Sequence, residues 1–298
     1  MDEVATGLKF PEGPIAMRDG TVLLVEIARG TLSRVDPATG SVDVVAECGG
    51  GPNGAAIGPD GAVYLCNNGG CFEWQDFGGL TIPGPPPSSY PGNGSIQRVD
   101  LATGAVTTVY TECDGLPLRA PNDIVFDTSG GMWFTDHGVR HERHSDRTGI
   151  YYAQPDGSSI AEVIFPLDAP NGIGLSPDGS RLYVAETHTG RVWSWDVTGP
   201  GEVGPQQLLY GLPGMQLLDS LAVDGEGYVC VATLVNGGIT SFSPDGETAE
   251  HLATGDPITT NICFGGDDLR TAYITASATG RLLRTGWPRK GLDLAYVA

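Results

Sequence analysis

The chain has 298 residues, among them 45 Gly and 22 Pro, and 40% of its residues are hydrophobic. Because glycine costs about 1 kcal/mol and proline about 3 kcal/mol in a helix interior, this composition argues against a long helical bundle and favours many short strands joined by turns. The chain carries 16 Lys and Arg against 36 Asp and Glu, a formal net charge of −20, which would repel nucleic acids and acidic membrane surfaces, so we expect neither as a partner.

The N-terminal residues 1–10 lack the basic and apolar regions of a signal peptide, and no apolar stretch approaches the ~20 residues that span a bilayer. We therefore expect a cytoplasmic protein, as a monomer or a small homo-oligomer. Only two of the cysteines are close in sequence, Cys66 and Cys71, and they lack C-x-x-C spacing. We expect buried thiols in a reducing compartment, with a Cys66–Cys71 disulfide as the alternative.

One phrase recurs along the chain: an apolar strand, a tight turn and a second, more hydrophobic strand. Its six copies begin at Gly13, Asn53, Asn122, Asn171, Asp219 and Asn261. Each copy continues into a third strand, and all but the last continue into a fourth. Four strands per ~40–50 residues is the module of a β-propeller blade. The sequence therefore predicts an all-β, six-bladed propeller with four antiparallel strands per blade, as a single domain over residues 1–298.

Two segments depart from the repeat. The second blade holds an insertion at about residues 69–94, rich in Gly and Pro but carrying Phe72, Trp74 and Tyr90. A flexible linker would lack these aromatic residues, so we expect the insertion to pack over one face of the disc and to wall a pocket. The last copy has no fourth strand of its own. The C-terminal residues 291–298 are a candidate for the strand that closes the ring.

A polar residue opens each repeat, and the start of the innermost strand of a propeller blade faces the central axis. These residues are Glu12, Asn53, Asn122, Asn171, Asp219 and Asn261. One interpretation is that the recurring Pro-Asn-Gly phrase merely turns the chain before each inner strand. That interpretation does not account for Glu12 and Asp219, because carboxylates that converge on a narrow axis repel one another unless a cation lies between them.

Two carboxylates and an amide oxygen form a hard ligand set. We expect Glu12, Asn171 and Asp219 to hold one divalent cation, Ca²⁺ first, with Mg²⁺, Mn²⁺ and Zn²⁺ as alternatives. Asp219 is then the candidate catalytic base, with one oxygen on the ion and the other free to take a proton from water. Asn122 and Asn53 would orient substrate oxygens.

Longer phrases carry a family resemblance. FPEGP at 10–14, APNDIVFDTSGGMWFTD at 120–136, APNGIGLSPDGSRLYVAET at 169–187, LDSLAVDGEGYVCVA at 218–232 and ICFGGDD at 262–268 resemble the SMP-30/gluconolactonase/LRE family, which includes regucalcin. The resemblance implies a six-bladed propeller that holds one divalent cation and hydrolyses lactones.

Carried onto this chain, the resemblance implies that Glu12, Asn171 and Asp219 are the metal ligands and that Asn122 faces both metal and substrate. It also places Arg119 near a substrate-binding arginine of the sugar lactonases, although the spacing in LRAPND differs. Where the family commonly has Gly after the acidic ligand, this chain has Ser220. The expected partner is a small-molecule lactone.

Three histidines lie close together in DHGVRHERH: His137, His141 and His144. Two interpretations stay open for this segment: a solvated charged loop, and a role for His137 in the wall of the substrate site, as a substrate-binding or acid/base residue. The chain has no G-x-S-x-G motif to anchor a serine esterase. The alternatives to a lactonase are a phosphotriester or other ester hydrolase on the same metal site, a non-enzymatic calcium-binding propeller and, more weakly, a strictosidine-synthase-like propeller.

Overall fold

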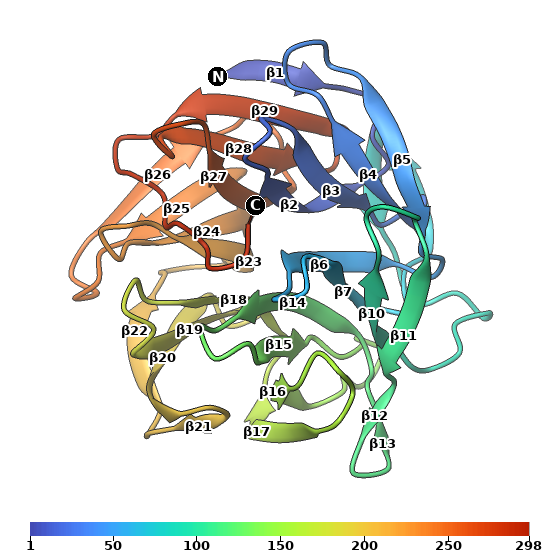
Figure 1. Ribbon diagram of the computed structural model, residues 1–298, viewed down its shortest axis with the longest axis vertical. Coiled ribbons are helices and arrows are strands. Elements are labelled where there is room, and N and C mark those ends of the chain that lie inside the picture. The colour runs from blue at the N-terminus through green and yellow to red at the C-terminus, as the bar shows by residue number, and fades with distance from the viewer. Residues whose placement is uncertain (298) are drawn as a thin grey trace.

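Six antiparallel sheets surround a common axis in the computed structural model, which describes residues 1–297 (Figure 1). This is the predicted six-bladed β-propeller. The described residues contain no helix, and so none with the length and apolarity needed to cross a bilayer. The six cysteines are all free thiols, which excludes the Cys66–Cys71 disulfide from this structure.

Each blade runs from an inner strand at the axis to an outer strand at the rim. Blade 1 consists of β2 (Pro11–Ala16), β3 (Val22–Glu26), β4 (Thr31–Val35) and β5 (Val42–Glu47), and blade 2 of β6 (Pro52–Ile57), β7 (Val63–Asn67), β10 (Ser95–Val99) and β11 (Val106–Tyr110). Blade 3 consists of β14 (Pro121–Phe126), β15 (Met132–Asp136), β16 (Thr148–Ala153) and β17 (Ile160–Leu167).

The remaining blades follow the same order. Blade 4 consists of β18 (Pro170–Leu175), β19 (Arg181–Glu186), β20 (Arg191–Gly199) and β22 (Gln207–Gly211), with a short extra strand β21 (Glu202–Val203) paired to β20. Blade 5 consists of β23 (Leu217–Val223), β24 (Val229–Leu234), β25 (Gly238–Phe242) and β26 (Ala249–Ala253). Blade 6 contains β27 (Thr259–Gly265), β28 (Thr271–Ala276) and β29 (Arg281–Gly286).

Closure of the ring differs from the sequence-based expectation. The outer strand of blade 6 is β1 (Asp2–Ala5), from the N-terminus, which pairs antiparallel with β29. Figure 1 shows the blue β1 beside the red β29. Residues 291–297 form no strand, although Gly291 makes an isolated bridge with Asp224 of blade 5. Ala298, the last residue of the expected closing segment, lies outside the described residues.

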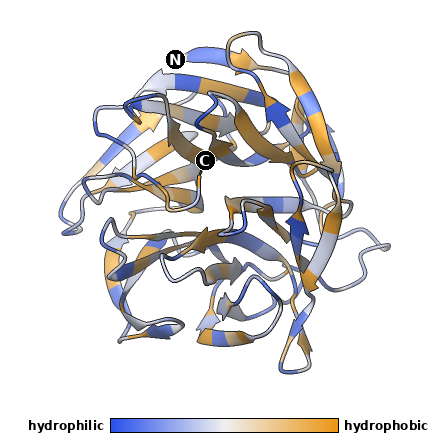
Figure 2. Ribbon diagram, viewed as in Figure 1, coloured by the Kyte–Doolittle hydropathy of each residue, from blue (hydrophilic) through white to orange (hydrophobic). Residues whose placement is uncertain are grey.

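The core lies between the blades. The second strand of every blade is almost entirely buried, whereas the outer strands β5 and β26 are largely exposed. Figure 2 shows mixed hydrophobic and hydrophilic residues along such outer strands as β5. A strand buried on both faces reads as a continuous apolar run, which is why the second strand is the most hydrophobic part of each repeat.

The insertion of blade 2 contains a hairpin, β8 (Trp74–Phe77) and β9 (Leu80–Pro83). Its Trp74 ring packs on Phe10 of blade 1 at a centroid distance of 4.9 Å. Further along, the Thr81 amide donates a hydrogen bond of 2.8 Å to the Ala278 carbonyl of blade 6. The insertion therefore reaches from blade 2 past blade 1 to blade 6. A second small hairpin, β12 (Glu112–Cys113) and β13 (Leu116–Pro117), precedes blade 3.

Candidate functional site

The inner strands lose regular pairing where the sequence places its polar residues. In all six blades, the register between the inner and second strands shifts near the start of the inner strand, as between Glu12 and Ile15 of β2. An irregularity of this kind re-aims side chains and is common beside active sites. The Pro-Asn-Gly phrases do not turn the chain before the strand, because Pro52 and Pro170 are the first residues of β6 and β18.

Glycine allows the inner strands to approach one another closely. A Cβ added to Gly172 would lie 2.5 Å from the Leu221 amide nitrogen, and one added to Gly54 would lie 2.5 Å from the Asn122 carbonyl oxygen. Neither gap admits a side-chain carbon. The glycine that follows Asn53 or Asn171 therefore brings the polar residues of neighbouring blades together at the axis.

These polar residues form what we call the axial cluster, which also includes one residue that the sequence analysis did not select, Asp123. Its members are Glu12, Asn53, Asn122, Asp123, Asn171, Asp219 and Asn261. Asp219 is half-buried and the other members are buried. Asn261 donates a 2.7 Å hydrogen bond from Nδ2 to Oε2 of Glu12, which also accepts the Gly13 amide. Oε1 of Glu12 and Oδ1 of Asn122 are buried without a hydrogen-bond partner among the described residues.

Asp123 takes the place that glycine has in the Pro-Asn-Gly phrases. The structure places it inside β14, where Oδ1 accepts the Ile124 amide at 2.9 Å and Oδ2 accepts the Ile173 amide of blade 4 at 3.4 Å. The one signal in the sequence was this acid at a glycine position. Beside it, Ser220 donates from Oγ to Oδ1 of Asn171 at 3.4 Å.

The axial cluster contains three carboxylates, Glu12, Asp123 and Asp219, and all three have raised pKa values. Burial raises the pKa of Glu12 well above its usual range, and the charges of Asp219 and Asp123 add to the rise. Burial also raises the pKa of Asp123 and of Asp219 to about 7, in the latter case with a further contribution from Asp123, while a hydrogen bond from Asn171 opposes it. Carboxylates in such surroundings bind a proton or a cation.

The donor set of the axial cluster fits a hard divalent cation. No three Asp, Glu, His or Cys side chains among residues 1–297 are placed to hold an ion by themselves, so an ion here requires amide oxygens as well. Such oxygens are present on Asn171 and Asn122, and Oδ1 of Asn122, like Oε1 of Glu12, is buried without a hydrogen-bond partner among residues 1–297. Carboxylate and amide oxygens are the ligands that Ca²⁺ and Mg²⁺ prefer.

A second set of polar residues supports the strands that carry the cluster. The last residue of the second strand in blades 1 to 4 accepts a backbone N–H from the segment just before its inner strand. These strand-end acceptors are Glu26, Asn67, Asp136 and Glu186, and their donors are the amides of Lys9 (2.7 Å), Gly51 (3.0 Å), Arg119 (2.6 Å) and Asp168 (2.9 Å). Blades 5 and 6 have Leu234 and Ala276 there instead. The sequence analysis missed these acceptors, which fix where the inner strand begins in blades 1 to 4.

Other residues selected from the sequence lie around the start of β14. The Arg119 guanidinium is paired with Asp146 at 3.2 Å, and the Arg119 carbonyl accepts a hydrogen bond from the Tyr90 hydroxyl of the insertion. His137 follows β15 and lies 5.8 Å, between ring centroids, from His188. In the loop beyond, His141 and His144 stack at 4.3 Å between ring centroids.

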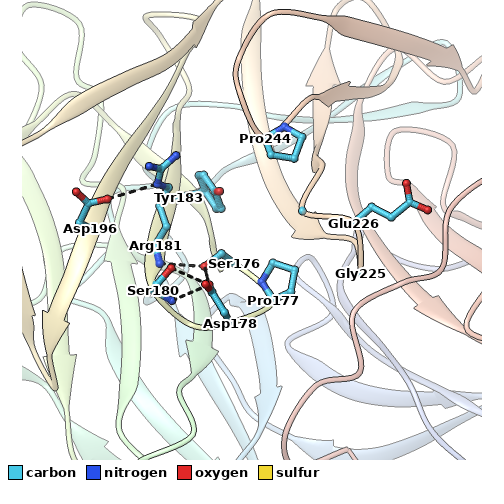
Figure 3. Close-up of a pocket in the computed structure, with 11 residues that line it drawn as sticks. Ser176, Pro177, Asp178, Ser180, Arg181, Tyr183, Asp196, Gly225, Glu226 and Pro244 are labelled. Carbon is cyan, nitrogen blue, oxygen red and sulfur yellow. Dashed lines mark hydrogen bonds and ion pairs between the residues drawn. The ribbon is translucent and has the colours of Figure 1, made fainter.

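A surface pocket of about 430 Å³ lies away from the axial cluster, between the turns of blades 4 and 5, and Figure 3 shows residues that line it. Its carboxylate Asp178 accepts hydrogen bonds of 2.7 Å from the hydroxyls of Ser176 and Ser180. These bonds lower the pKa of Asp178 to about 2. Asp178 is therefore satisfied by local donors, unlike Oε1 of Glu12 at the axis.

Comparison with known proteins matches this chain to one protein family and to proteins named as lactonases. Residues 10–278 match the family model described as the SMP-30/Gluconolactonase/LRE-like region. A gluconolactonase of Zymomonas mobilis is 26% identical, over 96% of this chain and 81% of that protein. The 6-deoxy-6-sulfogluconolactonase of Pseudomonas putida is 26% identical, over 94% of this chain and 88% of that protein.

The fold also matches solved structures. The calcium-binding protein regucalcin of Agrobacterium tumefaciens aligns with a TM-score of 0.77 over 98% of this chain and 95% of that chain, at 19% sequence identity. At this identity the likeness shows the shared fold alone.

Proposed function

This chain belongs to the SMP-30/gluconolactonase/LRE-like family, and we propose that it is an enzyme that opens a lactone by hydrolysis at the axial cluster, with the help of one divalent cation. Relatives named gluconolactonase and 6-deoxy-6-sulfogluconolactonase support a sugar lactone as the substrate class. The observation that carries the proposal is the convergence of Glu12, Asp123 and Asp219 from separate blades, with raised pKa values and with Oε1 of Glu12 unpartnered.

Glu12, Asn171 and Asp219 would hold the cation, with Asn122 as a fourth ligand, and Ca²⁺ is the ion we favour. The calcium-binding regucalcin of the same fold supports this choice. A bound divalent cation supplies Lewis-acid polarisation of a carbonyl oxygen and stabilises the negative charge that develops on it. Asn261 and the Gly13 amide hold Oε2 of Glu12, which leaves Oε1 as the oxygen that would bind the ion.

Asp219 is the proposed catalytic base. A bound cation would keep the pKa of Asp219 low, so that the carboxylate would be ionised and able to accept a proton at neutral pH. Asp219 takes a proton from the attacking water as the water oxygen bonds to the lactone carbonyl carbon. When the ring C–O bond breaks, the same proton returns to the leaving alkoxide oxygen, and the product is a hydroxy acid. The amides of Asn122 and Asn53 would orient the substrate oxygens during this sequence.

A lactone panel tests the proposal. Protein freed of metal by a chelator is restored with Ca²⁺, Mg²⁺, Mn²⁺ or Zn²⁺ and assayed by pH-stat against sugar, aliphatic and aromatic lactones. We expect turnover only in the restored protein, and its loss in Glu12→Gln and Asp219→Asn. Undiminished activity in the chelated protein contradicts the metal-assisted route. Cation binding without turnover of any lactone, or turnover of phosphotriesters alone, contradicts the lactonase assignment.

A further inference from the structure

Two imidazoles from neighbouring blades meet beside the axial cluster. His137 follows β15 of blade 3 and His188 follows β19 of blade 4, and their rings pack edge to face at 5.8 Å between centroids. Both lie at the edge of the blades where the inner strands begin. The His137 amide donates to the Ala120 carbonyl at 3.0 Å, two residues before Asn122. The Thr187 hydroxyl, adjacent to His188, accepts a 3.2 Å hydrogen bond from Nδ2 of Asn171.

The hydrogen-bonding state of His137 is fixed by its surroundings. Its Nδ1 lies 3.0 Å from the Gly138 carbonyl oxygen, and because a carbonyl only accepts, Nδ1 carries the hydrogen. Burial lowers the pKa of His137 to about 4 and also lowers the pKa of His188, so both rings are neutral at pH 7. Nε2 of His137 therefore retains a lone pair that can accept a hydrogen bond.

One polar atom of this histidine pair and one polar atom beside it lack a hydrogen-bond partner among the described residues. Nδ1 of His188 and Oε1 of Gln216 are buried, and neither has a hydrogen-bond partner among the described residues. Gln216 comes from the segment before β23 of blade 5, and it packs against the His188 turn, since a Cβ added to Gly190 would lie 3.3 Å from Cβ of Gln216. A buried polar atom left unpaired destabilises the protein, which favours a ligand that pairs with it.

The chemistry of these atoms selects the class of ligand group. The Gln216 oxygen and Nε2 of His137 only accept hydrogen bonds, and Nδ1 of His188 accepts or donates according to its tautomer. The charged groups nearest the imidazoles are of both signs, Asp168 beside both rings and Arg140 beside His188. An array of neutral acceptors without a net charge matches hydroxyl groups, which are neutral donors.

We propose that His137, His188 and Gln216 form a subsite that accepts hydrogen bonds from the hydroxyl groups of a polyhydroxylated lactone bound at the axial cluster. This inference rests on the proposed lactonase function and adds to it the part of the molecule that distinguishes a sugar lactone from an unsubstituted one. The three residues come from blades 3, 4 and 5, so they lie on one side of the ring.

The test compares two substrates of the cation-loaded enzyme, δ-gluconolactone and δ-valerolactone, which share the ring ester and differ in their hydroxyl groups. Gln216→Leu and His188→Phe are expected to lower kcat/KM for gluconolactone about tenfold each, as loss of one hydrogen bond predicts, and to leave valerolactone within about twofold. His188→Asn, which keeps a polar atom near the position of Nδ1, is expected to recover most of the loss. His144→Phe, at an exposed histidine, is the control.

Two outcomes overturn the subsite: equal losses on both lactones, which mark a structural role, and unchanged kinetics on gluconolactone. Calorimetric titration with the hydroxylated product, D-gluconate, provides a readout that needs no turnover. There Gln216→Leu is expected to raise Kd about tenfold, and equal affinity in the wild type and the variant also overturns the subsite. Failure of the wild type to open either lactone is a separate result, which refutes the proposed function.

Discussion

Two aspartates at different ends of the blades have pKa values shifted in opposite directions. Asp178 lies exposed in a turn, where hydroxyl and amide donors surround it and lower its pKa to about 2. Asp219 lies at the axis, where burial and the neighbouring Asp123 raise its pKa to about 7. An aspartate is therefore stabilised as an anion in the turn and destabilised as an anion at the axis.

This difference separates structural acids from candidate functional acids. Asp19, Asp60 and Asp245 are turn residues like Asp178, and hydrogen bonds likewise lower their pKa values, for Asp60 chiefly the bond from Arg98 of β10. They account for part of the net charge of −20 without any ligand. At the axis, by contrast, carboxylates from separate blades raise one another's pKa values. Perturbed pKa values of this origin are typical of functional sites.

The largest expected effect is on catalysis. Asp219→Asn removes the proposed base and one proposed ligand, so we expect kcat/KM on a lactone to fall by at least about 100-fold at saturating Ca²⁺. The matched change Asp178→Asn, in the turn, should leave kcat/KM within about twofold. Equal effects of the two substitutions would contradict the division into axial and turn carboxylates.

The pH dependence of stability should have opposite signs at the two places. An axial carboxyl with a pKa of about 7 in the folded chain and about 4 when unfolded stabilises the protonated folded state, and this contribution is lost as the pH rises from about 4 through 7. A shift of three pKa units corresponds to about 4 kcal/mol. For Asp178, whose pKa is lowered to about 2, the stabilisation is present above pH 4 and is lost as the pH falls toward 2.

Denaturant titration of the chelated protein between pH 5 and 8 measures the axial contribution. We expect the free energy of unfolding to fall with rising pH, and saturating Ca²⁺ to restore it at pH 8. The variant Asp123→Asn, which removes one of the opposing carboxylates, should flatten the dependence. A chelated wild type whose stability rises over this range would contradict the raised pKa values.

A smaller effect is expected from the glycines that let the inner strands approach. Gly172→Ala places a methyl group 2.5 Å from the Leu221 amide nitrogen and should cost about 1–3 kcal/mol. The control is Gly286→Ala, at the exposed end of β29, where an added Cβ meets nothing within 4 Å. Thermal melts of the two variants should differ accordingly, and equal melting temperatures would contradict the close approach at the axis.

Most of the fold was predictable because its determinants are local. A D-G-type turn between two apolar strands identifies a hairpin without knowledge of its neighbours, and six such hairpins at blade spacing indicate a propeller. The predicted closing strand of the ring was wrong because ring closure depends on a pairing between residues far apart in the chain. The pairing of β1 with β29 joins residues almost the whole chain apart, and the short strand Asp2–Ala5 carries no pattern that names its partner.

The candidate site was predictable only in part. Position in the repeat was enough to select Glu12, Asn171 and Asp219. Asp123 was missed because an acid after asparagine is typical of turns, and the sequence does not show the irregular register that places it at the axis. The strand-end acceptors Glu26 and Glu186 were missed because their role depends on backbone donors that only the folded blade brings close.

The central claim is that burial and mutual repulsion destabilise the ionised axial carboxylates, and that a bound divalent cation stabilises them. The direct test is calorimetric titration of metal-free protein with Ca²⁺ at pH 7 in buffers of different ionisation enthalpy, which counts protons released per bound ion. Because Glu12, Asp123 and Asp219 have raised pKa values, we predict release of about one proton or more, and its loss in Glu12→Gln/Asp219→Asn. Absence of binding, or binding without proton release, would contradict the account.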